Sequence, residues 1–395
     1  MVNPNRIRVL SFIESVTVTG PSRVLIDFAE QARHPEPGLP AVDVTLATYQ
    51  RGGGDSNLAK AARAAGVPVI DIPERNRWDA SVIAGVRRIV SEVKPDILES
   101  RNVKSHFLIR LTGLHRQVPW VAWNHGYTSK DRLDRAYTQL DRWSLHGAFR
   151  VMTVCQSFAA AIEKLGIARD RITVLHNFAK PYAPPDAEQV TRLKQQLGLG
   201  DELIVLTVGR MSREKGHTDL LSAIASLKDM PGLPRHRFVL VGDGPEEANL
   251  RSQAASLGID DRIVWTGFQG KVAPYYAIAN IFALPSHSEG SPNVVLEAMS
   301  AGLPMAATRA GGVPEILDDD VTGLLVPIRN PQALAEALRK LLLSEDLRTR
   351  LASAARRQVE SAHTLQAYRR DLTEFYLETL RMREGKTERS MTSKA

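Results

Sequence analysis

The chain has 395 residues, of which 43% are hydrophobic and 24% charged, and its formal net charge is +7. This length corresponds to about two or three domains of a globular protein, and the single cysteine, Cys155, excludes an internal disulfide and any Cys-x-x-Cys metal or redox pair. The excess of Lys and Arg fits a nucleic acid, an anionic membrane surface or anionic small substrates, and alone it separates none of these partners.

The expected location is the cytoplasm, including the inner face of the membrane. The first residues, "MVNPNRIRVLSF", lack the apolar core of a signal peptide, and no apolar run approaches the length of a membrane span. One cysteine also suits a reducing compartment.

The N-terminal half alternates short β-branched runs with helical patterns. Strands that are almost continuously apolar favour a parallel sheet covered on both faces. The expected strands are 7–13, 42–48, 67–72, 96–100, 119–124, 150–154 and 171–176, and the clearest helices are 22–32, 57–66 and 80–93.

The alternation stops in the proline-rich segment "NFAKPYAPPDAEQV" and then restarts. The expected strands of the second half are 203–209, 237–242, 262–267, 281–285, 304–308 and 323–327, followed by helical segments at 331–359 and 365–382. The fold class is therefore α/β, with two Rossmann-like, doubly wound parallel-sheet domains facing a central cleft. The predicted boundaries are 1–180 and 201–362 for the domains, 181–200 for a linker, 363–383 for a C-terminal helix that can cross back to the first domain, and 384–395 for a disordered tail.

The segment "EGSPNVVLEAMSAG" (289–302) holds two glutamates eight positions apart. Ser291 suits an N-cap, so a helix is expected from about 292 to 301, and its free N–H groups would form an anion site. The carboxylates of Glu289 and Glu297 can each accept hydrogen bonds from the hydroxyls of a sugar or ribose. The alternative is that Glu289 only completes the helix start and Glu297 is solvated, although the neighbours of Glu297 are apolar.

A second loop, "TVGRMSREKGH" (207–217), follows the first strand of the second half. Arg210, Arg213 and Lys215 lie beside the start of a helix, where cationic donors suit a diphosphate. No Ser or Thr follows Lys215, so the loop is not a P-loop. Taken alone, the loop fits a basic solvated turn equally well.

In this order, the motifs "VGRMSREKG", "VGDGP", "VWTGF" and "EGSPNVVLEAMSAGLPMAATRAGGVPEIL" resemble those of the retaining glycosyltransferases of family 4, which are group 1 glycosyl transferases with the GT-B fold. The resemblance covers nearly the whole chain and is strongest from 203 to 327. It implies that Glu289 contacts the transferred sugar, Glu297 the nucleotide ribose, and Arg210 and Lys215 the diphosphate of the donor. Further donor contacts implied by the resemblance are Gly290, Ser291, the amides of Asn293 and Val294, and Phe268 at the base pocket.

The N-terminal half matches the family less closely. The family has a Gly-Gly pair after the first strand, whereas this chain has Thr19 and Gly20 followed by Pro21, which lacks an N–H donor. Gly20 is still expected to contact the nucleotide-sugar donor. The loop "WNHGYTSKD" resembles the family's active-site loop, which assigns a contact with the donor sugar to His125. His106, His146 and His176 are expected to be structural.

The expected reaction moves a sugar from a nucleotide diphosphate sugar to an acceptor hydroxyl with retention, in polysaccharide or glycolipid assembly. No cofactor and no metal are expected, because Asp318, Asp319 and Asp320 are interpreted as solvated turn acids. The expected partners are the nucleotide-sugar donor and a saccharide or lipid-linked acceptor, and no nucleic acid is expected. Two alternatives stay open: a nucleotide-sugar-binding protein with weakened catalysis, and a dinucleotide oxidoreductase, which lacks its G-x-G-x-x-G motif here.

The segment "KDRLDRAYTQLDRWSLHGAFR" (130–150) has an apolar stripe at helical spacing, which Trp143 widens. An ordinary helix packed on the sheet explains this stripe. The further hypothesis is that its basic edge makes a weak, salt-sensitive contact with an anionic membrane, diluted by three aspartates, Asp131, Asp134 and Asp141.

Overall fold

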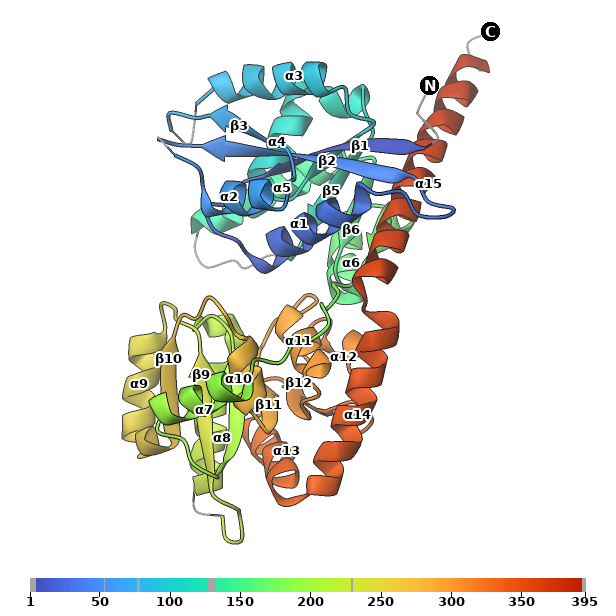
Figure 1. The fold of residues 1–395 in the computed structure, drawn as a ribbon. Helices are drawn as coiled ribbons and strands as arrows, with labels where there is room; N and C mark the ends of the chain where they lie inside the picture. Colours follow the sequence, from blue (N-terminus) through green and yellow to red (C-terminus); the bar gives the residue numbers. More distant parts are fainter. Residues whose placement is uncertain (1–4, 53, 77–78, 127–131, 229, 393–395) are drawn as a thin grey trace. The chain divides into compact units, whose positions relative to one another are not determined.

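The computed structural model describes residues 5–392 except 53, 77–78, 127–131 and 229, together with their side chains except those of 132–136 and 386–392. The chain forms two compact units (Figure 1). The N-terminal unit contains Met1–His176 together with Leu365–Ala395, and the C-terminal unit is Asn177–Thr364.

The N-terminal unit is built on a seven-stranded parallel sheet in the order β3-β2-β1-β4-β5-β6-β7, with helices on both faces (Figure 1). All seven expected strands are present. The strands are β1 Arg6–Ile13, β2 Ala41–Gln50, β3 Val69–Pro73, β4 Ile97–Ser100, β5 Trp120–Asn124, β6 Arg150–Thr153 and β7 Ile172–Val174. The helices are α1 Gly20–Ala32, α2 Asn57–Ala64, α3 Ser81–Val93, α4 Val103–Thr112, α5 Arg132–Leu145, α6 Gln156–Glu163 and α15 Leu365–Thr392.

The C-terminal unit repeats this architecture with a six-stranded parallel sheet in the order β10-β9-β8-β11-β12-β13. Its strands, all expected, are β8 Leu203–Val208, β9 His236–Val241, β10 Ile263–Gly267, β11 Ile281–Leu284, β12 Met305–Thr308 and β13 Leu324–Val326. Its helices are α7 Ala187–Gln196, α8 His217–Lys228, α9 Glu247–Ser256, α10 Ala273–Ile278, α11 Asn293–Ser300, α12 Val313–Ile316, α13 Pro331–Leu343 and α14 Glu345–Ala362.

Both sheets reverse their strand order at one point, between β1 and β4 in the first unit and between β8 and β11 in the second. In doubly wound sheets, ligands bind beyond the carboxyl ends of the strands at such a switch point. The loops that follow β8 and β11 carry the two motifs that the sequence predicts to bind the donor.

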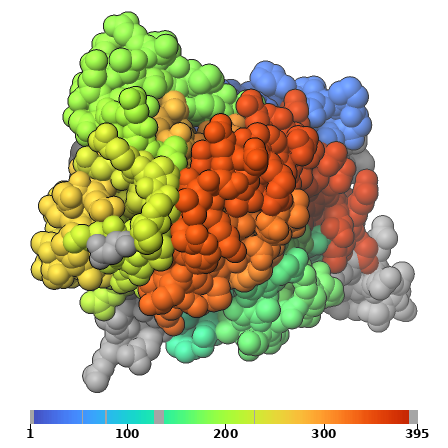
Figure 2. Space-filling view, turned by 90° about the horizontal axis from the view of Figure 1, so that it is seen from below, coloured from blue at the N-terminus to red at the C-terminus, as the bar shows by residue number. Residues whose placement is uncertain are grey.

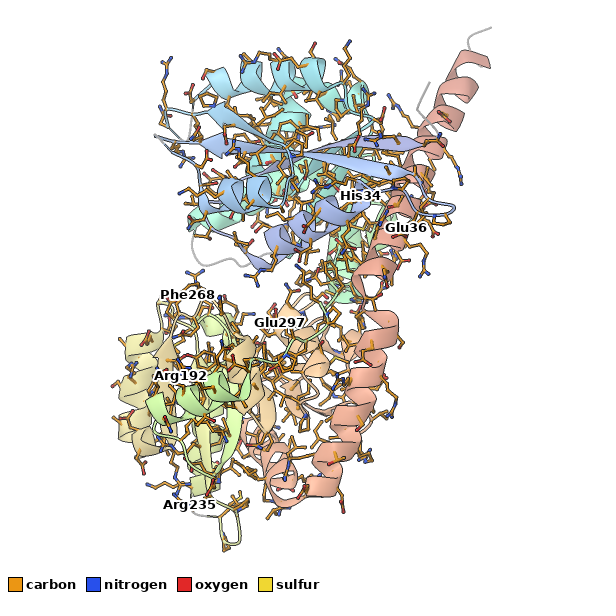
Figure 3. All side chains as sticks on the ribbon, viewed as in Figure 1. His34, Glu36, Arg192, Arg235, Phe268 and Glu297 are labelled. Carbon is orange, nitrogen blue, oxygen red and sulfur yellow. The ribbon has the colours of Figure 1, made fainter. Side chains whose placement is uncertain are left out.

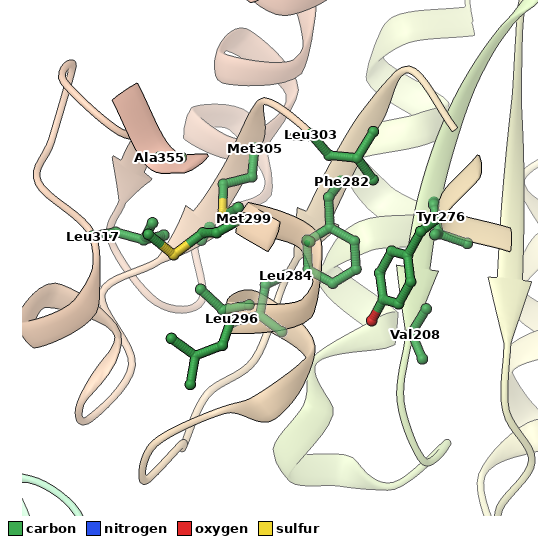
Figure 4. Packing of buried hydrophobic residues seen from close by; sticks show 14 of the residues in the cluster. Val208, Tyr276, Phe282, Leu284, Leu296, Met299, Leu303, Met305, Leu317 and Ala355 are labelled. Carbon is green, nitrogen blue, oxygen red and sulfur yellow. The ribbon is translucent and has the colours of Figure 1, made fainter. Parts of the chain in front are cut away.

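Helix α11 is fixed by the core of the C-terminal unit. Leu296 and Met299 on α11 are fully buried and pack in one cluster with Phe282 and Leu284 of β11 (Figure 4). Burying each such side chain contributes about 1.5–3 kcal/mol. The start of α11, where the anion site is expected, is therefore held on a rigid support.

Several segments differ from the sequence predictions. The expected linker 181–200 contains helix α7, whose Val190 and Leu193 pack on the core of the C-terminal unit, and the chain divides between the units at Asn177. The expected helix 331–359 is interrupted at Ser344, whose side chain caps α14 by accepting a hydrogen bond from the amide of Leu347.

The C-terminal end also differs from its prediction, because α15 continues to Thr392 where disorder was expected from 384. This helix belongs to the N-terminal unit, in which Tyr368, Leu372, Phe375 and Tyr376 are buried. Among the described residues, no helix combines the length and the apolar character that crossing a membrane requires.

Helix α5 also departs from its predicted faces. Trp143, assigned to the apolar stripe, has 47% of its surface exposed, and Asp141, assigned to the charged edge, is buried. The Nδ1 atom of His106 lies 2.5 Å from the Asp141 carboxylate, which gives this acid a buried partner. Lys130 and Asp131 of the predicted segment lie outside the described residues.

Candidate active site

Two loops meet at the switch point of the C-terminal sheet. After β8, a short 3-10 turn over Arg213–Lys215 leads through Gly216 into α8, and the amide of His287 donates to the carbonyl of Glu214 at 2.8 Å. Gly216 has φ +65°, and a Cβ there would lie 2.0 Å from the carbonyl oxygen of Pro285. Only glycine allows the loops after β8 and β11 to approach this closely.

Lys215 and Glu289 form the centre of this site. The ammonium group of Lys215 lies 2.7 Å from Oε1 and 2.9 Å from Oε2 of Glu289, and the hydroxyl of Ser286 donates to Oε1 at 2.6 Å. Glu289 is only 7% exposed. A lysine has three donors and a carboxylate about four acceptor positions, so one donor of Lys215 and one acceptor position of Glu289 stay available for a ligand.

The backbone of Glu289 is held from a third loop, which follows β12. The amide of Gly312 donates to the carbonyl of Glu289 at 3.2 Å, and Gly311 has φ +52°. A Cβ on Gly311 would lie 1.8 Å from that carbonyl oxygen. Neither Ser286 nor Gly311 was singled out in the sequence, although Gly311 lies within the quoted family motif.

The start of α11 differs from the prediction in one detail. Pro292, not Ser291, occupies the N-cap position, and no side chain caps the helix. The hydroxyl of Ser291 instead accepts the amide of Asn177 at 2.8 Å, and the side-chain amide of Asn177 donates to the carbonyl of Ser291 and to Oδ1 of Asn293, both at 2.8 Å.

These bonds fix Gly290 and Ser291 in the approach to the helix. The first N–H groups, those of Asn293 and Val294, have no acceptor within the helix and face outward from its start. In the sequence, Asn177 was noted only as the first residue of the proline-rich segment, so its role here was missed.

Glu297 is half-buried on α11 and has a specific partner. The hydroxyl of Tyr276 on α10 donates to Oε2 of Glu297 at 2.8 Å. Burial, and then the charge of the Glu297 carboxylate, raise the pKa of Tyr276 well above its usual value, so this hydroxyl stays protonated as a donor. The close view in Figure 4 shows the Tyr276 ring beside Phe282.

Arg210 and Phe268 are both exposed at this edge of the unit. Among the described residues, the side chain of Arg210 makes no hydrogen bond or ion pair, whereas the neighbouring Arg213 pairs with Glu246 at 3.1 Å. Phe268 follows β10 with 73% of its surface exposed, and Figure 3 shows it at the same upper edge as Glu297. The structure thus brings Lys215 and Glu289 into contact and leaves Arg210 available to a ligand.

His125 belongs to the N-terminal unit, where it ends β5. Its ring stacks on that of Trp123 with centroids 5.8 Å apart and planes 16° apart. Its Nε2 atom is buried and has no hydrogen-bond partner among the described residues. Burial, and then the charges of Arg101 and His106, lower the pKa of His125 to about 3, so the ring is neutral at pH 7.

A buried network supports Trp123. Its indole N–H donates to Oε1 of Glu99 at 2.7 Å, and the hydroxyl of Tyr376 on α15 donates to the same oxygen at 2.6 Å. Arg101 pairs with Oε2 of Glu99 at 3.1 Å and lies 4.2 Å from the centre of the Trp123 ring. Glu99 and Arg101 were not singled out in the sequence, because acids and bases inside strands carry no motif.

Gly20 is the first residue of α1 in the same unit. The hydroxyl of Ser22 accepts the amide of Thr19 at 2.7 Å, and Pro21 occupies the first turn without an N–H. Ser22 therefore satisfies part of the helix start internally.

The acids of the turn at 318–320 were expected to be solvated rather than metal ligands. Asp319 and Asp320 pair with Arg309 and Arg350 at 2.6 and 2.8 Å. Among the described residues, no group of three or more His, Cys, Asp or Glu side chains is placed to hold a metal ion.

Comparisons with known proteins show which family each unit resembles. The family model described as "Glycosyl transferases group 1" matches residues 189–358, and the "Glycosyl transferase 4-like domain" model matches residues 30–177. The C-terminal unit thus matches the group 1 glycosyl transferases, and the N-terminal unit matches the 4-like domain. The group 1 match begins in α7 and ends in α14, so it spans both donor loops of the C-terminal unit.

Curated glycosyltransferases match the chain in part. A lipopolysaccharide core biosynthesis glycosyltransferase, LpsE, of Rhizobium meliloti is 32% identical over 46% of this chain and 50% of its own length. A D-inositol 3-phosphate glycosyltransferase of Saccharomonospora viridis is 37% identical over 42% of this chain and 40% of its own length. The chain thus spans about half the length of these relatives.

The GT-B fold is shared over nearly the whole chain. The structure of HepE from Anabaena in complex with UDP-glucose matches 94% of this chain and 100% of that chain, with a TM-score of 0.81 and 21% identity. This likeness establishes the fold of both units.

Proposed function

We propose that this protein is a retaining, metal-independent glycosyltransferase that uses a nucleotide diphosphate sugar. The observation that carries the proposal is the contact of Lys215 with Glu289 beside the uncapped start of α11. This arrangement sets a cation and free amides next to a carboxylate, which are the groups needed for a diphosphate and for sugar hydroxyls. The relatives named above act in glycosyl transfer, which supports the same activity.

In the proposed donor complex, the free donor of Lys215, the guanidinium of Arg210 and the amides of Asn293 and Val294 bind the diphosphate. Negative charge develops on the leaving diphosphate as its bond to the anomeric carbon breaks, and these preorganised donors stabilise it. They supply positive charge without a metal ion. Glu289 accepts a sugar hydroxyl through its remaining acceptor position, and Glu297 accepts a ribose hydroxyl.

The proposed step proceeds on one face of the sugar. The acceptor oxygen bonds to the anomeric carbon, the bond from this carbon to the diphosphate oxygen breaks, and the acceptor proton passes to the leaving diphosphate. A neutral His125 can hydrogen-bond a sugar hydroxyl without placing a positive charge near the electron-poor anomeric carbon.

The activity is tested by incubating the full chain with UDP-, GDP- and ADP-sugars and oligosaccharide acceptors. Expected results are release of the nucleotide diphosphate and, by NMR, a product with the anomeric configuration of the donor. The rate should be unchanged after removal of divalent cations with EDTA. An inverted product, or loss of activity with EDTA that Mg²⁺ restores, would contradict the proposed mechanism, and tight binding without turnover would favour the binding-protein alternative.

The ribose contact is tested with Glu297→Gln. The amide keeps the size of the side chain but loses the charge, so affinity for the nucleoside diphosphate in calorimetry should fall by about tenfold. Glu360→Gln, which removes an exposed acid of α14, is the matched control and should leave the affinity unchanged. Equal affinities of the two variants would eliminate the ribose role.

We also propose a weak contact of the N-terminal unit with anionic membranes, which would bring the enzyme to a lipid-linked acceptor. Trp143 on α5 and Leu111 on α4 are each 47% exposed, and the Arg110 guanidinium lies 5.3 Å from the Trp143 ring. An exposed aromatic ring with a cation beside it suits the interface of an anionic bilayer. Since Asp141 is buried, it does not dilute the basic edge of α5.

Vesicle sedimentation at low salt tests this contact. Anionic vesicles should retain more protein than neutral ones, and Trp143→Ser should reduce the difference. Equal sedimentation with anionic and neutral vesicles would contradict the membrane contact. The acceptor would then be a saccharide that is not bound to lipid.

A further inference from the structure

A cavity of about 410 Å³ lies at the opposite edge of the C-terminal sheet, by the amino ends of β8, β9 and β10. The loops after β8 and β11 that carry Lys215 and Glu289 are at the carboxyl ends, so the two places are separate. Figure 2, which views the molecule from below, shows the yellow-green segment before β9 at the surface, and Figure 3 places Arg235 at this lower end. The charged residues that line the cavity are Glu202, Lys228, Arg235, Arg237, Asp261 and Arg262.

The cations of this cavity make few hydrogen bonds or ion pairs with the described residues. Hydrogen bonds from the amides of Glu202 and Gly200 lower the pKa of Glu202, and the charges of Arg235 and Arg237, which lie near it, lower this pKa further. Arg262 donates to the carbonyl of Lys228 at 3.2 Å, but among the described residues Lys228, Arg235 and Arg237 make no ion pair. The Nε atom of Arg237 is buried and has no hydrogen-bond acceptor in the described part of the chain. Glu202 accepts the amide of Gly200 at 3.2 Å. The described lining thus contains four cations against two acids.

His236 adds a buried group that lacks a partner. It lines the cavity with only 8% of its surface exposed, and its Nδ1 lies 2.8 Å from the carbonyl oxygen of Pro234. Because that oxygen only accepts, Nδ1 carries the proton, and in the neutral ring Nε2 is an acceptor. Nε2 is buried without a hydrogen-bond partner among the described residues. An unsatisfied buried acceptor is unfavourable, which favours a ligand that brings a donor.

We propose that this cavity binds a phosphate group, as free phosphate or as the phosphate ester of a small molecule. A phosphate oxygen accepts hydrogen bonds from Arg235, Arg237 and Lys228, while a phosphate hydroxyl, or a hydroxyl of the esterified molecule, donates to Nε2 of His236. Protonation of His236 serves the same ligand, since its Nε2–H then donates to a phosphate oxygen. Sulfate has a similar shape and charge but no proton to donate at neutral pH, so it satisfies only the cations as long as the His236 ring is neutral.

The pKa of His236 should report whether an anion is bound in the cavity. Burial lowers the pKa of His236, and the charge of Arg262 lowers it further, against the opposing effect of the bond to Pro234. The charged groups that face it are the six that line the cavity, from the starts of β8 and β9, the end of α8 and the turn before β10. A bound anion next to His236 favours the protonated ring and should raise its pKa.

The experiment is a titration of the full chain, labelled with ¹³C in its histidine rings, with inorganic phosphate at constant ionic strength and pH 7. The signal of His236, assigned by its loss in His236→Asn, should shift in a saturable manner, and its pKa should rise in excess phosphate. The same titration with glycerol 3-phosphate tests a phosphate ester. Whichever of the two probes binds more tightly shows whether the cavity prefers free phosphate or an ester. Sodium sulfate should produce a weaker, non-saturating response.

The variants decide whether this cavity is the binding site. The double variant Lys228→Gln/Arg235→Gln changes two exposed side chains, and it should weaken the response about threefold to tenfold. Arg192→Gln removes an exposed cation of α7 and should have no effect, as should Lys215→Ala in the donor loop. The proposal is overturned by the absence of a saturable shift, by an equal response to sulfate, or by an unchanged response in the double variant.

Discussion

At the scale of single residues, the positive charge available in the donor site depends on the ion pair between Lys215 and Glu289. The sequence placed both residues in donor binding through the family resemblance, but it gave no sign that they contact each other. Their ion pair leaves Arg210 as the cation of this loop that makes no ion pair among the described residues. The net positive charge offered to a diphosphate is therefore close to that of Arg210 and the start of α11.

Lys215→Ala should lower kcat by about a hundredfold, the effect of removing one donor from a charge-stabilising site. Arg213→Ala is the matched control, because Arg213 lies in the same turn but is exposed and paired with Glu246. It should change kcat by about twofold or less. Steady-state kinetics with a saturating donor make the comparison, and similar losses in both variants would mean that the loop acts only through its overall charge.

His125 should make stability depend on pH. Its pKa is about 3 in the folded protein and 6.5 as the ordinary value, so between these values the unfolded state binds a proton that the folded state does not. The contribution of His125 to the free energy of unfolding is therefore fully present above pH 6.5, and it decreases as the pH falls below this value. Between pH 7 and pH 5.5 the loss should be about 1 kcal/mol.

Urea unfolding of the N-terminal unit at these two pH values, in the parent protein and in His125→Gln, measures this contribution. The variant should lose about 1 kcal/mol less than the parent on acidification. His146→Gln, which removes an exposed histidine from the same unit, should behave as the parent does. If His125→Gln also follows the parent, the ring is not held neutral.

Some residues of the site have no signature in one sequence. Tyr276 acts through a hydrogen bond to Glu297, and Asn177 through three hydrogen bonds to Ser291 and Asn293. Such partners are set by folding rather than by local spacing. Glu99 is similar, because a buried acid within a strand is recognised only when its donors, Trp123 and Tyr376, are seen around it. The glutamates and basic residues of the donor loops were predictable, because they follow strands within a motif.

At the scale of elements, every strand was predictable, since continuous apolar runs bounded by polar residues indicate a buried parallel sheet. The helix at 293–300 was also predicted, within about one residue at each end, from its flanking Ser-Pro and Gly. The failures have a common physical cause. Helix α7 begins directly after a proline-rich stretch, and its packing against the C-terminal core stabilises a segment that composition alone marks as a linker.

Glycines at the ends of strands decide how closely the loops of the site approach. Gly311→Ala should destabilise the C-terminal unit by about 2 kcal/mol or more and abolish most activity, because the added Cβ meets the Glu289 carbonyl at 1.8 Å and φ is +52°. Gly270→Ala is the control, since no atom lies within 4 Å of its added Cβ. Thermal unfolding and turnover of both variants test this, and a stable, active Gly311→Ala would show that the loop after β12 does not position Glu289.

At the scale of the whole molecule, the N-terminal unit is discontinuous in sequence. Its sheet comes from the first 176 residues, but residues from 365 onward belong to it as well. Tyr376 lies against Phe28 of α1, with ring centroids 6.2 Å apart, and reaches Glu99 beneath Trp123. The sequence allowed a C-terminal helix to cross back, but it contained nothing to specify which residues the helix would contact.

A chain that ends at Thr364 should therefore lose the fold of its N-terminal unit, although the deletion lies at the opposite end of the sequence. The deletion removes five buried hydrophobic side chains, those of Tyr368, Leu372, Phe375, Tyr376 and Leu380. Their burial contributes on the order of 10 kcal/mol, comparable with the total stability of a domain. The C-terminal unit keeps both donor loops and should still bind the nucleoside diphosphate.

Calorimetric scans and limited proteolysis of the 1–364 chain should show one remaining transition and a protected fragment that begins near Asn177. A chain ending at Gly385 retains all five buried residues, and it should behave as the full protein does. Two intact transitions in the 1–364 chain would mean that α15 only covers a unit that is already stable. Loss of nucleotide binding together with the N-terminal fold would mean that the C-terminal unit does not hold the donor by itself.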